Sequence, residues 1–125
     1  MVASKGYRVR MKDINREAIA AGYRRIDEIF RGRIARRRMK KTEPINIFAR
    51  ISTSTDYVGF SSAGCVLEAI VEDMEIKKKV LREAEKELGR HVVFASNTSA
   101  LSIDDLQNAA KWPGRGVGLH FFNPV

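Results

Sequence analysis

Hydrophobic and polar residues in the first forty positions follow two successive periods. Tyr7, Val9 and Met11 alternate with three basic residues, which predicts a short strand over 7–12. Large apolar residues then recur in steps of three or four from 16 to about 38, as on one face of an amphipathic helix. They are Ile19, Tyr23, Ile26, Phe30 and Ile34. Asp13-Ile14-Asn15 separates the two segments, and an Asp or Asn there can cap the helix.

The rest of the chain continues this alternation of strands and helices. Thr42-Glu43-Pro44 breaks the first helix, and 45–50 is compatible with a short helix or a loop. Strands are predicted over 51–57, 65–71, 92–95 and 116–122, and helices over 74–88 and 101–110. Ser99 or Ser102 opens the last of these helices. The order predicts an α/β fold with a parallel sheet flanked by helices, in a single domain of residues 1–125.

Charge and composition narrow the class of protein. The net charge is +8, and seven basic residues crowd into 31–41. This run could bind nucleic acid or an anionic surface, or it could be a solvated helix face. No apolar stretch reaches the length of a membrane helix, and the N-terminus has no apolar run of the secretory kind. Cys65 is the one cysteine and has no internal disulfide partner, which favours a reducing compartment.

Two groups of acidic residues follow predicted strands. Asp13 ends the first strand, where a carboxylate can receive the ribose hydroxyls of a dinucleotide or simply cap a helix. The second group runs from Glu68 to Asp73 and includes Lys77. Glu72 and Asp73 follow the strand over 65–71 at the start of the next helix, and Lys77 lies in the first turns of that helix. Ligands of parallel α/β sheets bind outside the carboxyl ends of strands, whereas helix capping is the structural alternative for this second group.

Two further groups follow the later strands. Ser96-Asn97-Thr98-Ser99 offers hydroxyls and an amide to a ligand, or forms a turn rich in helix caps. His120 lies in a nearly apolar segment, where a histidine is either a satisfied core residue or a general acid/base at a strand end. Asn123 follows three residues later and could hold a ligand carbonyl or hydroxyl.

The glycine pattern of a dinucleotide site is absent from the chain. A G-x-G-x-x-G motif would lie roughly 20 residues before Asp13, where backbone amides could approach a pyrophosphate. Only twelve residues precede Asp13, and Gly6 is the one glycine among them. The glycines at 114, 116 and 118 enter a strand and have the wrong spacing.

Taken in order, four segments resemble the NAD-binding domain of the L-3-hydroxyacyl-CoA dehydrogenases. They are "RVRMKDIN" (8–15), "VLEAIVEDMEIKKKV" (66–80), "VVFASNTSALSI" (92–103) and "GVGLHFFNPV" (116–125). "SNTS" followed by "HFFNP" at this spacing is the most specific pair. The segment "YRRIDEIFRGRIARRRMKK" (23–41) is most similar to the alpha subunits of the multifunctional fatty-acid oxidation complex, in which an enoyl-CoA hydratase domain comes first.

The resemblance implies roles for individual residues in NAD-dependent oxidation of 3-hydroxyacyl-CoA during fatty acid β-oxidation. Asp13 would bind the adenine ribose of NAD, and Glu72 and Lys77 would lie along the nicotinamide ribose. Ser99 would hydrogen-bond the substrate oxygen and the nicotinamide region. His120 would be the catalytic acid/base, with Asn123 positioning substrate or cofactor beside it. No metal is implied. The compartment would be the bacterial cytoplasm, or the mitochondrial matrix in a eukaryote.

Measured against that family, the chain is expected to be truncated at both ends. The resemblance implies an incomplete Rossmann-type parallel sheet that lacks the first strand and the glycine-rich loop. That strand would lie between the strands over 7–12 and 65–71, so its loss would leave unpaired edges and marginal stability. The glutamate that orients the histidine and the C-terminal helical domain are also expected beyond 125. We therefore expect the fragment to be inactive alone.

Overall fold

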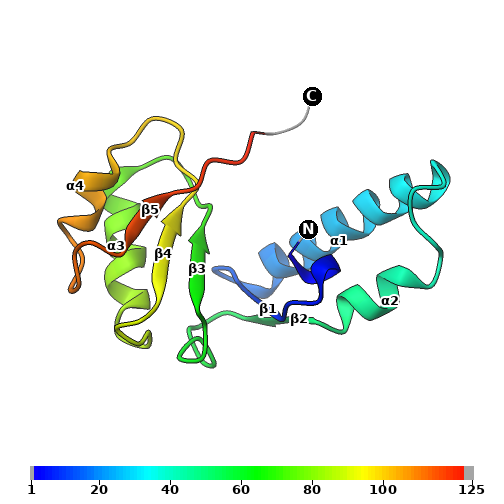
Figure 1. The fold of residues 1–125 in the computed structure, drawn as a ribbon, viewed down its shortest axis with the longest axis horizontal. Helices are drawn as coiled ribbons and strands as arrows, with labels where there is room; N and C mark the ends of the chain where they lie inside the picture. Colours follow the sequence, from blue (N-terminus) through cyan, green and yellow to red (C-terminus); the bar gives the residue numbers. More distant parts are fainter. Residues whose placement is uncertain (1, 123–125) are drawn as a thin grey trace. The chain divides into compact units, whose positions relative to one another are not determined.

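The computed structural model describes residues 2–122, which form two compact units, Met1–Val58 and Gly59–Val125. Both units contain parallel strands and helices (Figure 1), so the predicted α/β class is confirmed. The strands lie in two separate sheets of two and three strands. None of the described helices is long and apolar enough to cross a membrane.

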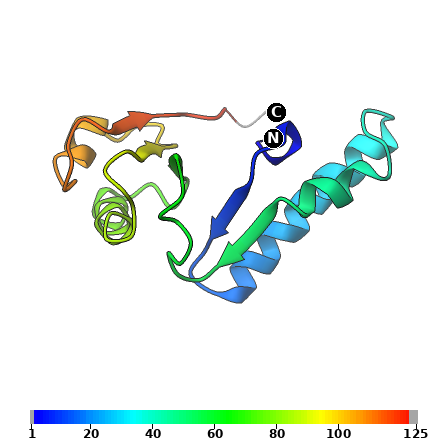
Figure 2. The same cartoon turned by 60° about the horizontal axis from the view of Figure 1, so that its bottom comes forward.

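The first unit is a β-α-β crossover with a short 3-10 helix in front. Its elements are η1 (Ala3–Lys5), β1 (Val9–Lys12), α1 (Arg16–Ala35), α2 (Glu43–Phe48) and β2 (Ile51–Ser54). β1 pairs with β2 in parallel, with Val9 opposite Ile51. Figure 2 shows α1 running beside the two strands, and the Tyr23 hydroxyl donates to the Ile51 carbonyl at 3.1 Å. The buried core consists of Ala3, Phe30 and Ile47, with Val9, Ile26, Met39, Phe48 and Ile51 packed around it.

Helix α1 begins where it was predicted and ends three residues early. Asn15 is its N-cap, accepting from the Ala18 amide at 2.8 Å. The helix ends because Arg37 takes a left-handed conformation (φ 55°). The Arg38 amide then bonds the Arg33 carbonyl, and the Arg37 amide bonds the Ile34 carbonyl. This is the hydrogen-bond pattern of a Schellman cap, with an arginine where glycine is usual.

Residues 45–48 of the ambiguous segment over 45–50 belong to a helix that begins earlier than expected, and residues 49–50 form a turn. Helix α2 spans Glu43–Phe48, so Pro44, which marked a break, lies in its first turn. Proline suits that place because the first amides of a helix have no intrahelical acceptor. The Glu43 side chain also accepts from the Lys40 amide at 2.8 Å, which ties the incoming loop to the helix start.

The second unit carries a three-stranded parallel sheet in the order β3-β4-β5. Its elements are β3 (Cys65–Glu68), α3 (Met74–Ala84), β4 (Val93–Ser96), α4 (Ile103–Gln107) and β5 (Gly116–Gly118). Ala95 pairs with Leu67 on one side and with Val117 on the other. The buried hydrophobic residues are Phe60, Leu81, Ala84, Leu88, Val92, Phe94, Ala95 and Leu106.

All predicted elements of this unit are present. β4 keeps the predicted length and begins one residue later, and the other elements are shorter than the sequence pattern suggested. α3 ends at Ala84 and continues to Leu88 only as turns. β3 ends at Glu68 and β5 at Gly118, although apolar residues continue beyond both. A strand needs a partner for its backbone, and these continuations leave the ladder. The residues after β3 and β5 therefore lie in loops at the carboxyl ends of these strands.

Glycines in β5 allow α4 to pack closely on this strand. A Cβ atom at Gly116 would lie 3.0 Å from the Gln107 Cβ, and one at Gly118 would lie 3.3 Å from Ile103 Cγ1. Both distances are tighter than ordinary van der Waals contact. The glycine pattern that does not suit a phosphate loop therefore has a packing role.

The separation of the strands into two sheets agrees with the expected incomplete parallel sheet. Within residues 2–122, β1 has β2 as its one partner, and β3 has β4 as its one partner. β1 and β3 are thus edge strands of their sheets, and these are the two strands between which the missing strand was expected. The marginal stability expected from these edges, and the single-domain assignment of 1–125, stay predictions.

Candidate functional site

A buried ion pair joins the end of β3 to helix α3. Lys77 Nζ lies 2.7 Å from Glu68 Oε1, and each side chain is 1% exposed. Glu68 Oε1 also accepts from the Ile70 amide at 2.7 Å, and Glu68 Oε2 accepts from the Ser96 hydroxyl at 2.6 Å. A buried charge pair is costly unless its remaining polar atoms are satisfied, and here they are hydrogen-bonded.

Glu72 extends this network to the loop after β4. Glu72 Oε1 accepts from the Thr98 hydroxyl (2.6 Å) and from the amides of Ser99 (2.8 Å) and Ala100 (3.1 Å). Lys77 Nζ lies 3.4 Å from Glu72 Oε2. The Thr98 hydroxyl, followed by the Ser99 amide, the Ala100 amide and Lys77, lowers the pKa of Glu72 to about 2 against partial burial, which raises it. The carboxylate therefore stays charged at any physiological pH.

Helix capping explains Asp73 but not Glu72. Asp73 is the N-cap of α3 and accepts from the Ile76 amide at 2.9 Å. Ser102 caps α4 in the same way, at 3.1 Å from the Asp105 amide. Of the two serines that could open that helix, Ser102 is the one that does so. Ser99 instead points its hydroxyl toward Glu72, at 3.3 Å.

The loop over 96–99 is held at each of its four residues. Ser96 and Thr98 donate to the two glutamates, and Thr98 Oγ1 accepts from the Leu101 amide at 2.9 Å. Asn97 Oδ1 accepts from the Phe121 amide at 2.6 Å. The loop is therefore a preformed turn, and the exposed Ser99 lies at its surface.

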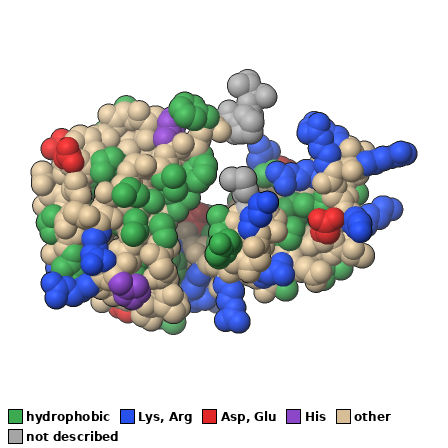
Figure 3. All heavy atoms as spheres, in the orientation of Figure 1, with side chains coloured by type: hydrophobic (Ala, Val, Ile, Leu, Met, Phe, Trp, Pro, Cys, Tyr) green, Lys and Arg blue, Asp and Glu red, His purple; other side chains and the backbone are tan. Residues whose placement is uncertain are grey.

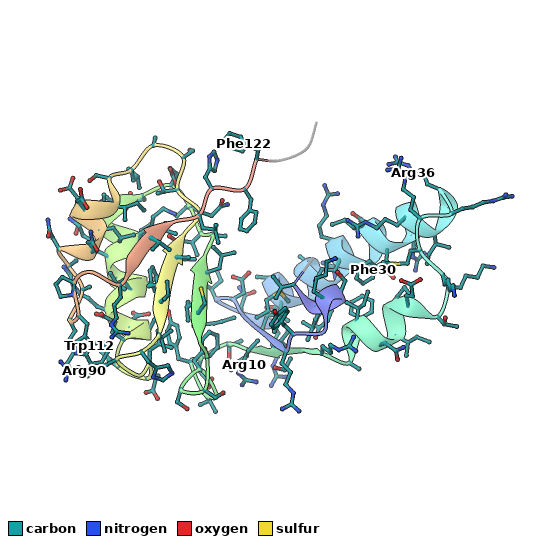
Figure 4. All side chains as sticks on the ribbon, in the orientation of Figure 1. Arg10, Phe30, Arg36, Arg90, Trp112 and Phe122 are labelled. Carbon is teal, nitrogen blue, oxygen red and sulfur yellow. The ribbon has the colours of Figure 1, made fainter. Side chains whose placement is uncertain are left out.

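His120 lies beside this loop and is not a core residue. The Leu119 amide donates to the Ser96 carbonyl at 2.8 Å. The amides on both sides of His120 are therefore bonded to Ser96, the last residue of β4, and to Asn97 after it. His120 is exposed, and its ring lies 4.5 Å from that of Phe122. Figure 4 shows Phe122 at the end of the unit where the three strands finish, and Trp112 and Arg90 at the opposite end. The core alternative for this histidine is therefore wrong.

The structure thus brings most of the predicted site to one edge of the second unit. Glu72, Lys77, Ser99 and His120 all lie at the carboxyl ends of β3, β4 and β5. Asn123 lies outside the described residues. The carboxylates and imidazole here could orient polar ligand groups and move a proton. No group of three potential metal ligands was found among the residues that the structure describes.

Asp13 belongs to the first unit and does not cap helix α1. Capping was the structural alternative to a ligand-binding role for this residue. Asn15 caps α1, whereas Asp13 is exposed and its side chain accepts from the Ile14 amide at 2.8 Å. The Asp13 amide donates to the Ser54 carbonyl at 3.3 Å, which fixes the residue at the ends of β1 and β2. The exposed carboxylate of Asp13 is therefore accessible to a ligand.

Glu68 was named with the second acidic group in the sequence, but no individual role was predicted for it. A charged residue inside the apolar run over 65–71 was the available signal, since a carboxylate in a buried strand needs a partner. Its side-chain partners, Lys77 and Ser96, are 9 and 28 residues away in the chain, and no local pattern identifies them.

The basic run over 31–41 forms an exposed surface at the end of α1. All seven of its basic residues are exposed, and Arg31 pairs with Asp27 at 2.6 Å. Figure 3 shows the Lys and Arg side chains of the first unit projecting from its surface. The residues are Arg31, Arg33, Arg36, Arg37, Arg38, Lys40 and Lys41.

Comparison with known proteins agrees with the resemblance read from the sequence. The sequence model of one protein family, the 3-hydroxyacyl-CoA dehydrogenase NAD-binding domain, matches residues 1–125. FadB2 of M. tuberculosis is 31% identical (TM-score 0.94), and the match covers 99% of this chain and 44% of that one. (S)-3-hydroxybutyryl-CoA dehydrogenase PaaH1 of Ralstonia eutropha is 32% identical (TM-score 0.93), covering 98% and 44%. 3-hydroxybutyryl-CoA dehydrogenase of Escherichia coli K12 is 30% identical (TM-score 0.91), covering 98% and 26%.

This chain therefore spans less than half the length of these structures. The match over all 125 residues gives the domain its cofactor, NAD, and an oxidoreductase ancestry. On these grounds the chain belongs to the 3-hydroxyacyl-CoA dehydrogenase NAD-binding domain family.

Proposed function

We propose that this chain, as part of a longer protein, serves the NAD-dependent oxidation of L-3-hydroxyacyl-CoA to 3-oxoacyl-CoA in fatty acid β-oxidation. The observation that carries the proposal is the gathering of Glu72, Ser99 and His120 at the carboxyl ends of three parallel strands. Ligands of open α/β sheets bind at that edge. Residues 1–125 would be part of one NAD-binding domain.

The site residues divide between catalysis and binding. His120 and Ser99 are the proposed catalytic residues, and Ser99 and Asn123 are the proposed substrate contacts. The proposed direct cofactor contacts are Asp13, Glu72, Ser99 and Asn123. Lys77, predicted as a further contact, has a side chain that is 1% exposed and would act on the cofactor through Glu72. Asp13 would accept the hydroxyls of the adenine ribose, because an exposed carboxylate without a capping role offers two acceptor oxygens.

Proton removal from the substrate alcohol is the step assigned to His120. An alcohol is a poor hydride donor until its proton is taken, and a neutral imidazole accepts a proton near pH 7. The exposed ring, on backbone held at Leu119 and Phe121, can meet a hydroxyl at the strand edge. Ser99 would orient the same oxygen through its hydroxyl. NAD, when bound, supplies the acceptor for the hydride from C3.

The residues present suit the ribose groups of NAD better than its pyrophosphate. Carboxylates at 13 and 72 can each accept ribose hydroxyls. The printed sequence contains no G-x-G-x-x-G whose amides could bind phosphate. We therefore expect the 125-residue chain to bind NADH at least about tenfold more weakly than a full-length dehydrogenase, because each charge-assisted hydrogen bond is worth about 1.5–3 kcal/mol.

Titration of the chain with NADH, followed by nucleotide fluorescence, tests the proposal. Glu72→Gln should weaken binding by about tenfold, the loss expected for one hydrogen bond to a charged acceptor. Glu85→Gln is the matched control, because Glu85 also accepts two backbone amides but lies just after α3, at the end of the helix opposite to Glu72. Equal affinities of the Glu72 variant and the wild type would contradict the assigned site. Affinity within tenfold of a full-length enzyme would contradict the importance of the glycine-rich loop.

The charge of the first unit favours a second candidate function, a non-enzymatic module that binds nucleic acid or anionic surfaces. Residues 1–58 contain fifteen Lys and Arg against six Asp and Glu, whereas residues 59–125 contain eight against nine. An RNA complex that weakens steeply with salt, with a log–log slope reduced by roughly 2 on removing three Arg of the run over 31–41, would support it. The same residues could instead bind the phosphates of coenzyme A. Displacement of the RNA by free coenzyme A would indicate a coenzyme A site and not a nucleic-acid site.

The proposed activity needs further domains and a reducing compartment. A C-terminal helical domain would close over the acyl chain, and a hydratase domain could precede the dehydrogenase. The bacterial cytoplasm, or the mitochondrial matrix, is the proposed location, because the single cysteine makes no internal disulfide and such compartments keep thiols reduced.

A further inference from the structure

We infer that Glu68 is a positioning residue of the cofactor site, which fixes Lys77 and through it the carboxylate of Glu72. This inference rests on the proposed function, because it assumes that Glu72 faces the nicotinamide ribose. Glu68 touches no exposed surface of the site, since its side chain is 1% exposed. Its contribution must therefore pass through the groups it holds.

Glu68 holds three donors from three parts of the unit. Lys77 Nζ comes from α3, the Ile70 amide from the segment after β3, and the Ser96 hydroxyl from the end of β4. All three bonds are 2.6–2.7 Å long. Charge-assisted bonds of this length inside a low-dielectric interior fix the geometry of their partners strongly. Glu68 thus sets where the Lys77 ammonium lies.

Lys77 in turn lies between two carboxylates of unequal surroundings. Its Nζ is 2.7 Å from Glu68 Oε1 and 3.4 Å from Glu72 Oε2. Glu72 Oε1 accepts from Thr98, Ser99 and Ala100. Glu72 Oε2 has the longer Lys77 contact, and the Glu72 side chain is 37% exposed. Oε2 is therefore the oxygen left for a ligand hydroxyl, and the position of Lys77 decides its charge environment.

Glu68→Gln removes the charge while keeping the size of the side chain. The Lys77 ammonium then has Glu72 as its one remaining charged partner in this network and is drawn toward it. Such a movement occupies Oε2 and pulls Glu72 away from the amides of Ser99 and Ala100. The same substitution at Glu85 removes a charge that holds the Lys111 and Trp112 amides instead.

Amide hydrogen exchange, measured by NMR on the full chain without cofactor, tests the inference. Glu68→Gln should lower protection at Ser99 and Ala100 by about tenfold more than at Lys111 and Trp112, and Glu85→Gln should give the reverse pattern. A uniform loss of protection over all four amides would mean that Glu68 only stabilises the fold, and would overturn the inference. This readout needs no nucleotide, so it remains decisive if NADH does not bind.

A double variant separates positioning from stability in the cofactor titration. Glu68→Gln with Lys77→Met removes both buried charges, and the amide oxygen of the glutamine can still accept a hydrogen bond from Ile70 or Ser96. Glu72 loses its lysine partner but is 37% exposed, so no buried charge is left without a partner. We expect this variant to keep the unfolding midpoint close to that of Glu85→Gln and still bind NADH about tenfold more weakly. NADH affinity at the wild-type level would overturn the inference. Absence of NADH binding by the wild-type chain would contradict the proposed function instead.

Discussion

Glu72 and Thr98 show how single side chains hold the candidate site in place. The Thr98 hydroxyl donates to Glu72 Oε1 at 2.6 Å and is the largest cause of the lowered pKa of this carboxyl. Because the folded pKa is about 2 and the ordinary value is 4.5, ionised Glu72 favours the folded state above pH 4.5. That contribution is lost as the pH falls from 4.5 toward 2.

Thr98→Val should raise the pKa of Glu72, because it removes the strongest hydrogen bond to the charged form. Titration of the Glu72 carboxyl by ¹³C NMR measures this directly. We expect a midpoint near 2 in the wild type and a higher midpoint in the variant. Thr42→Val is a control of the same chemistry, because the Thr42 side chain makes no capping bond in α2. A wild-type midpoint near 4.5 would contradict the described network.

At the residue scale, local roles could be predicted and long-range partners could not. Asn15 and Ser102 cap helices, as their places before apolar-periodic segments suggested. Such caps involve amides three residues away, so the sequence carries the signal. Glu72 is bonded to residues 26–28 positions away, and its role depends on how two strands end side by side. The exposure of His120 likewise depends on where β5 leaves the ladder.

The end of helix α1 offers a test at the scale of one element. Arg37 has φ 55°, a conformation that costs an L-residue roughly 1–2 kcal/mol and costs glycine little. Arg37→Gly should therefore raise the free energy of unfolding by about 1 kcal/mol, measured by urea denaturation. Arg33→Gly, inside the same helix, should lower it by about 1 kcal/mol. A destabilised Arg37 variant would contradict the Schellman cap.

The two glycines inside α1 allow a second comparison. A Cβ at Gly32 would meet nothing within 4 Å, whereas one at Gly22 would lie 3.3 Å from Met11 Sδ and Cε. Gly32→Ala should stabilise the protein by roughly 0.8–1 kcal/mol, the full helix-propensity gain. Gly22→Ala should stabilise it less, because the Met11 side chain must move. An equal gain at both positions, again in urea, would contradict the close packing of β1 on α1.

At this scale, the sequence predicted which elements exist better than where they end. Every predicted strand and helix is present, because hydrophobic periodicity follows from burying one face. The ends are set by features without a periodic signal. An arginine in a left-handed conformation ends α1, and the last turn of α3 opens after Ala84. Pro44 was predicted to interrupt helical structure, and it does lie at a helix boundary. It lies in the first turn of α2, however, and does not follow the end of a helix.

At the scale of the whole molecule, the two units differ in both charge and content. Residues 1–58 carry a large basic excess and the exposed carboxylate of Asp13, whereas residues 59–125 are nearly balanced and carry Glu72, Ser99 and His120. The strand–helix order predicted parallel pairing, which is confirmed in both sheets. The α/β class follows from that order, but the division of the strands into two sheets depends on which backbone edges find partners, which periodicity does not encode.

The central claim is that the carboxyl ends of β3, β4 and β5 form the nicotinamide half of an NAD site. An NMR titration of the chain with nicotinamide mononucleotide tests it most directly, because this probe lacks the adenosine half. We expect amide shifts at Ser99, Ala100, Leu119 and His120, which are smaller in Glu72→Gln and unchanged in Glu85→Gln. Shifts confined to other residues, or equal shifts in the Glu72 variant, would contradict it.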